Sequence, residues 1–225
     1  MKTAPKLALL AGVVALAAGC ATQKPYDYSA FKQHRPKSIL VMPPLNTSPD
    51  IGAPAAVLSQ VTFPLAESGY YVMPVAVVDE VFKQNGLSTA ADAHATSPAK
   101  LLQIFGADAA LYLDVKKYGT TYAIISSESV VALEAKLIDL RTGTLLWAGS
   151  ASASSAEQQG NSGAGGLIGL LVVALVNQIL DTVNDRSYSV AGIADQRLLA
   201  AGRPSGLLYG CLLYTSDAAD EGLGV

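Results

Sequence analysis

Cysteine, histidine and charged residues are all scarce in this chain, and each scarcity excludes a class of function. Two cysteines and two histidines among 225 residues are too few for a disulfide-rich scaffold and lack the spacing of a zinc site. Charged residues make up 15% of the chain, and the net charge of −3 has the wrong sign for nucleic-acid binding. With 51% hydrophobic residues, the chain is expected to fold as a globular protein with no cofactor and no metal.

The N-terminal residues are organised like those of an exported bacterial precursor. Lys2 and Lys6 form a charged region, residues 7–18 are apolar, and small residues precede Cys20. The apolar run is about a dozen residues long, shorter than the ~20 that a membrane-spanning helix needs. We therefore expect residues 1–19 to be a signal peptide that is cleaved before Cys20.

The residues around Cys20 resemble the lipobox of bacterial lipoproteins. In that motif the cysteine thiol receives a diacylglycerol and small residues precede it, as Ala18 and Gly19 do here, although Ala17 stands where leucine is commoner. The resemblance implies lipidation of Cys20, and Ala21 after it implies transfer to the outer membrane. Several acyl chains, at ~0.8 kcal/mol per buried CH₂, would hold the chain stably at the membrane. The alternative is an ordinary secretory peptide with an unrelated cysteine.

Residues 20–37 are predicted to be a tether, because they are polar, contain prolines and lack any strand or helix period. Residues 38–153 are predicted to form an α/β domain. Its first half alternates strands and helices, which indicates a sheet with helical crossovers. The predicted strands are at 38–42, 70–73 and 109–115, and the predicted helices are at 55–68 with a break or kink at Pro64, at 75–84 and from Ser97 to Gly106. Residues 87–96, which include His94, are predicted to be a loop.

The second half of the domain is expected to be antiparallel. Strands are predicted at 120–125, 129–140 and 144–153, and the last two should form a hairpin with Gly143 in its turn. Leu133 and Leu137 alternate with Glu134 and Lys136, so those charged residues should lie on an exposed face. Together the two halves predict an α/β (α+β) fold, a mixed sheet with flanking helices.

A flexible joint is predicted at 154–166, where glycine, serine and alanine dominate. Gly163 to Gly166 lack the Gly-Lys-Ser/Thr ending of a phosphate-binding loop. Residues 164–176 are apolar on every side but too short to span a bilayer. They either pack against the sheet or dock onto a partner lipoprotein or the bilayer surface, and the candidate partner-contact residues are Leu167, Ile168, Leu170, Leu171 and Leu175.

The rest of the C-terminal segment, 167–210, is predicted to be helical, with an amphipathic helix at 187–201. Residues 211–225 resemble a translated sequencing-adapter read-through, and we expect them to be an artefactual tail.

Several stretches, taken in order, resemble one family of Gram-negative lipoproteins of unknown function. They are the lipobox at Cys20, residues 37–46, 68–72, 106–109 and 139–143, Trp147, and the glycine-rich joint before Leu167. The resemblance implies a fold like the N-terminal domain of the translocation protein TolB, with C-terminal helices after the joint. It also implies an accessory role beside lipoproteins like the curli secretion protein CsgG, and no catalytic residue.

Three functions follow as hypotheses. The first is a non-enzymatic outer-membrane lipoprotein, facing the periplasm, that supports an envelope or secretion assembly through another lipoprotein or self-association. The second is a ligand-binding sensor with a cleft at the carboxyl ends of the parallel strands, near residues 42–46 and 73–74. The third and remotest is a serine hydrolase using Asp108, His94 and a serine, although no Gly-x-Ser-x-Gly motif is present.

Overall fold

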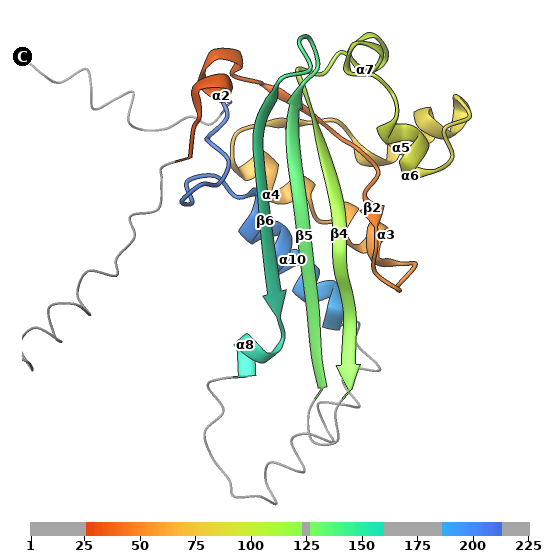
Figure 1. Cartoon of the computed structure of the whole chain (residues 1–225), viewed down its shortest axis with the longest axis vertical. Coiled ribbons are helices and arrows are strands. Elements are labelled where there is room, and N and C mark those ends of the chain that lie inside the picture. The colour runs from red at the N-terminus through yellow and green to blue at the C-terminus, as the bar shows by residue number, and fades with distance from the viewer. Residues whose placement is uncertain (1–25, 123–126, 160–185, 213–225) are drawn as a thin grey trace, which may run out of the picture.

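The computed structural model describes residues 26–122, 127–159 and 186–212, and a six-stranded sheet forms its centre (Figure 1). The strand order is β3-β1-β4-β5-β6, and β2 pairs with β4 off this path. The pairs β1–β3, β1–β4 and β2–β4 are parallel, while β4–β5 and β5–β6 are antiparallel. The predicted mixed sheet with flanking helices is therefore confirmed. The strands are β1 (Ser38–Val41), β2 (Leu45–Asn46), β3 (Tyr71–Val72), β4 (Ala109–Tyr122), β5 (Ser127–Asp139) and β6 (Leu145–Ser154).

The antiparallel half is built from long strands. The strand predicted at 109–115 and the described part of the one predicted at 120–125 are one strand, β4, which a bulge between Val115 and Lys117 interrupts without ending; residues 123–125 lie outside the described residues. The predicted hairpin between β5 and β6 is confirmed. Gly143 adopts a φ of +73°, and the Asp139 carboxylate accepts hydrogen bonds from the Arg141 and Thr142 backbone N–H groups.

Several helices differ from those predicted. The helix expected at 55–68 is two short helices, and the chain breaks between them before Pro64. Pro64 lies in the first turn of the second helix, where its missing N–H costs no hydrogen bond. The predicted loop at 87–96 contains a helix, and the predicted tether at 20–37 contains another. The helices are α2 (Ser29–His34), α3 (Ala53–Leu58), α4 (Thr62–Glu67), α5 (Val75–Gln84), α6 (Ala90–His94), α7 (Pro98–Phe105), α8 (Ala156–Gln159) and α10 (Arg186–Leu199).

Two hydrophobic clusters lie on opposite faces of the sheet. The larger one places Leu111, Leu133 and Trp147 against α3, α4 and α10, and α10 lies behind β4 to β6 in Figure 1. The smaller one places Leu40 and Ala110 against residues of α5, α6 and α7. Because α10 belongs to the larger cluster, this part of the C-terminal segment packs on the domain itself.

The folded body begins before the predicted domain start at Ser38. Phe31 in α2 is 3% exposed and belongs to the larger cluster, and the Tyr26 hydroxyl accepts a hydrogen bond from the Ala148 backbone N–H. The aromatic residues of the predicted tether therefore pack on the domain, because burying them stabilises the fold more than leaving them in water.

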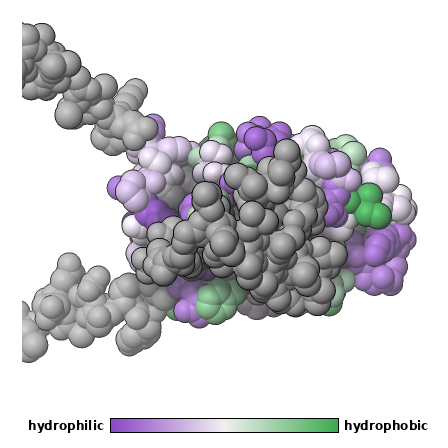
Figure 2. Space-filling view, turned by 90° about the horizontal axis from the view of Figure 1, so that it is seen from below, coloured by the Kyte–Doolittle hydropathy of each residue, from purple (hydrophilic) through white to green (hydrophobic). Residues whose placement is uncertain are grey.

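Figure 2 views the molecule from the end of the sheet where β4 ends and β5 begins. The described surface that is visible there is mainly hydrophilic, with small separate hydrophobic areas. α8 follows β6 and α10 starts beside Thr120, so the chain leaves and re-enters the described body at this end (Figure 1).

Candidate functional site

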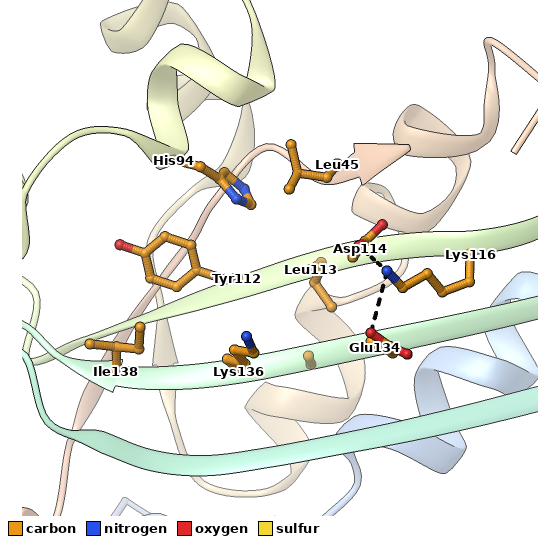
Figure 3. A pocket seen from close by; sticks show the side chains of 10 residues that line it. Leu45, His94, Tyr112, Leu113, Asp114, Lys116, Glu134, Lys136 and Ile138 are labelled. Carbon is orange, nitrogen blue, oxygen red and sulfur yellow. Dashed lines mark hydrogen bonds and ion pairs between the residues drawn. The ribbon is translucent and has the colours of Figure 1, made fainter. Parts of the chain in front are cut away.

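A hollow of about 360 Å³ lies on the face of the sheet that α10 does not cover (Figure 3). It is bounded by α6 and β2 on one side and by β4 and β5 beneath. Its lining residues all come from these four elements: Leu45, His94, Tyr112, Leu113, Asp114, Lys116, Glu134, Ala135, Lys136 and Ile138.

His94, the last residue of α6, is fixed at the rim of the hollow. Its Nε2 lies 2.8 Å from the Pro43 carbonyl oxygen, which can only accept, so Nε2 carries the proton. The ring meets Tyr112 edge to face with centroids 5.0 Å apart. Burial lowers the pKa of His94, so the imidazole is neutral at pH 7.

A carboxylate pair with one lysine forms the other side of the hollow. Asp114 and Glu134 are direct partners in the β4–β5 register. The Lys116 ammonium donates to Asp114 and lies 3.4 Å from a Glu134 carboxylate oxygen, as Figure 3 shows. The hydrogen bond to Asp114 raises the pKa of Lys116. The second oxygen of Asp114 is buried and has no hydrogen-bond partner among the described residues.

The charged groups of the hollow lie close together, with Lys116 between Asp114 and Glu134, and none of the lining residues is a serine or a cysteine. No group of three or more His, Cys, Asp or Glu side chains within residues 26–122, 127–159 and 186–212 could hold a metal ion. In those same ranges no helix is both long enough and apolar enough to cross a bilayer.

Asp108 and His94, the residues named for a hydrolase, take part in different networks. The Asp108 carboxylate accepts hydrogen bonds from the Lys37 and Ser38 backbone N–H groups and pairs with Arg141 at 2.9 Å. These contacts tie the start of β1 to the start of β4 and to the β5–β6 turn. Asp108 is thus held by the fold, and His94 by the Pro43 carbonyl.

The sequence predicted part of this site. Glu134 and Lys136 are exposed on the outer face of β5, as their alternation indicates. The cleft expected near residues 42–46 corresponds to the hollow at Leu45, whereas residues 73–74 do not line it. Tyr112 and Asp114 were missed, although they alternate with the buried Leu111 and Leu113 in the same way. Cys20 and the partner-contact residues Leu167, Ile168, Leu170, Leu171 and Leu175 lie outside the described residues.

Comparison with known proteins gives consistent matches. The sequence model of the family described as "Putative lipoprotein GNA1162-like" matches residues 26–212. The chain is 50% identical over 208 residues to "Putative lipoprotein NMB1124/NMB1162" of Neisseria meningitidis serogroup B, which covers 92% of this chain and 95% of that protein.

Two solved structures are also similar to this chain. The crystal structure of lipoprotein GNA1162 from Neisseria meningitidis is 52% identical in sequence, covers 65% of this chain and 99% of its own, and superposes with a TM-score of 0.52. A PelC dodecamer from Paraburkholderia phytofirmans is 17% identical, covers 74% of this chain and 90% of its own, and has a TM-score of 0.39. The family model and the 50% identical relative together show that this chain belongs to the GNA1162-like lipoprotein family.

Proposed function

We propose that this lipoprotein is held at the periplasmic face of the outer membrane by acyl chains on Cys20, and that it works by binding another envelope protein. The observation that carries the proposal is the membership of a lipoprotein family in a chain whose cysteine follows a signal-like segment and small residues. Ala21 after the cysteine supports the outer membrane as the destination.

Contact rather than chemistry is supported by the character of the site. Lys116 pairs with Asp114 and Glu134, and His94 lies against the Pro43 carbonyl, which supports a role for these groups in holding the sheet face. The apolar segment at 164–176 supports a protein partner, because such a stretch needs cover on more than one side.

Lipidation is tested by the change Cys20→Ser in the full chain expressed with its N-terminal segment. Intact-mass measurement should show a cleaved, acylated wild type, whereas the variant should lack the acyl mass and leave the membrane fraction on a salt wash. Ser29→Ala, an exposed change in α2 nine residues after the cysteine, is the matched control and should stay acylated. A Cys20→Ser protein that is processed normally and remains membrane-bound contradicts the proposal.

Partner binding is tested in the same membranes by deleting residues 167–180 while Cys20 is kept. The deletion should remove proteins that copurify with the wild type, and circular dichroism should show that the α/β body still folds. A wild-type protein that purifies from gently solubilised envelopes without any partner counts against the proposed function.

A ligand-binding role is the second candidate, and the hollow beside Leu45 and His94 favours it. Polar groups that converge on a hollow with some apolar lining are typical of small-molecule sites. A ligand bound there would shift the NMR resonances of Tyr112 and Lys136, and periplasmic extracts fractionated by size provide the trial ligands.

A further inference from the structure

A groove runs along the outer edge of β6, on the side away from β5. Its volume is about 550 Å³. The strand from Trp147 to Ser152 forms one wall, and Arg197 and Leu198 of α10 together with the turn at 203–206 form the other. β6 is an edge strand, since the sheet order ends with it.

Along this groove, some outward-facing backbone N–H and carbonyl groups of β6 have hydrogen-bond partners and others have none among the described residues. The Ala148 N–H donates to the Tyr26 hydroxyl, and the Ser152 carbonyl accepts from Arg197, so both residues direct their backbone polar groups away from β5. Ser150 lies between them and has the same orientation, because residues two apart along a strand repeat. In the part of the chain that the structure describes, neither its N–H nor its carbonyl has a partner across this edge. An exposed edge of this kind is a template for an added strand.

The opposite wall is held rigidly. The Trp147 indole N–H donates to the Ser205 carbonyl at 2.9 Å, and the Tyr28 hydroxyl donates to the Gly206 carbonyl at 2.5 Å. Ser205 has a φ of +57°, an uncommon conformation for a residue with a side chain. The turn is therefore fixed in place by contacts from β6 and from the N-terminal residues, so that the groove is already formed.

The charge of the groove indicates what would enter it. Arg203 is exposed and forms no ion pair among the described residues, and Arg197 closes the far end while pairing with Glu157. We infer that this groove binds an extended segment of a protein partner, which adds a short strand to β6 at Ser150 and places an acidic side chain against Arg203. The free stretch lies between the occupied Ala148 N–H and the occupied Ser152 carbonyl, which leaves room for about three residues at ~3.4 Å each.

A second copy of this chain fits the groove less well. Two β6 edges paired antiparallel about Ser150 would bring a second Arg197 and a second Arg203 to the same groove, and like charges there would repel. The inference rests on the proposed partner-binding role and gives it a surface.

The test selects a phage-displayed library of random seven-residue peptides on the full chain purified in detergent. Peptides that carry Asp or Glu among β-branched residues should be enriched. A synthetic copy of one of them should bind at least about tenfold more weakly to the Ser150→Pro and Arg203→Glu variants. Because the Ser150 N–H points away from β5, proline removes no bond within the sheet. Ser150→Ala keeps the main chain and is the matched control, expected to bind as the wild type does.

Amide hydrogen exchange gives an independent measurement on the wild type. The Ser150 amide should exchange at least about tenfold more slowly when the peptide is bound, whether or not the proline variant folds. Failure to enrich acidic peptides, or unchanged exchange at Ser150, overturns the inference. Self-association of the wild type that Ser150→Pro abolishes also overturns it, because a second copy would then occupy the edge. If the peptides fail while partner copurification still depends on residues 167–180, the proposed function stands and this surface is wrong.

Discussion

Asp195 of α10 is an acid buried in the apolar core. It is 1% exposed, and neither carboxylate oxygen has a hydrogen-bond partner among the described residues. Burial raises the pKa of Asp195 to about 8, because the charged form is poorly solvated there. In the unfolded chain the same group titrates near about 4. Between these two values the native state holds a proton that the unfolded state has lost, so stability falls as the pH rises from about 4 to about 8.

Replacing this acid removes the pH dependence that it causes. Asp195→Asn should abolish a loss of up to about 1.4 kcal/mol per pH unit across that window, measured by urea unfolding from pH 5 to pH 8. Asp79→Asn, which removes an exposed carboxylate paired with Lys83, is the control and should leave the slope unchanged. His94 contributes in the opposite direction, since its lowered pKa costs stability as the pH falls below about 6.5, and comparing variant with wild type cancels it. Equal slopes for Asp195→Asn and wild type would show that the carboxyl is solvated.

Strand β6 needs a glycine at position 149, because the Trp147 ring lies against the backbone there. A Cβ at Gly149 would lie 2.2 Å from the Trp147 ring, and that ring is 1% exposed, so it has little room to move. The missing side chain at Gly149 is therefore a packing requirement between β6 and the core beneath it.

Gly149→Ala should lower the free energy of unfolding by roughly 1–3 kcal/mol. Trp147 is the single tryptophan in the chain, so its fluorescence spectrum reports the displacement directly. Ser152→Ala, on the exposed side of the same strand, should leave both the spectrum and the stability close to wild type. An unchanged spectrum for Gly149→Ala would mean that the ring lies elsewhere.

Periodicity predicts the long elements well and the short ones poorly. β5 was located because its buried residues alternate with more exposed ones over many positions. α6 was missed because five residues are too few to show a helical period. Its signal is local: Thr89 caps the helix by accepting from the Asp92 N–H. The hollow could be predicted only in part, since the contact of His94 with Tyr112 depends on how α6 packs over β4.

At the scale of the whole molecule, the residues after α10 close the fold at the edge opposite β6. The Gly210 and Leu212 N–H groups donate to the Ser68 and Gly69 carbonyls at 2.8 and 3.1 Å. The Tyr70 hydroxyl donates to the Leu208 carbonyl, and Leu207 is 1% exposed. Residues 207–212 therefore belong to the body, and the predicted tail boundary at 211 falls inside this contact.

A chain ending at Gly206 should be less stable than one ending at Leu212 by roughly 2–5 kcal/mol, because it loses a buried leucine and these hydrogen bonds. Urea unfolding of the two chains measures the difference. Leu212→Ala in the longer chain is the control, since that side chain is 58% exposed and its backbone bond survives. Equal stabilities would show that these residues do not hold the edge of the sheet.

The bonds from Tyr26 to Ala148 and from Tyr28 to Gly206 also determine how mechanical load enters the protein. A pull on the chain ahead of Tyr26 reaches β6 and the turn beside it before it reaches β1. We expect the load to be shared between the sheet edge and the C-terminal turn, so that β1 is peeled away less readily than it would be without these two bonds.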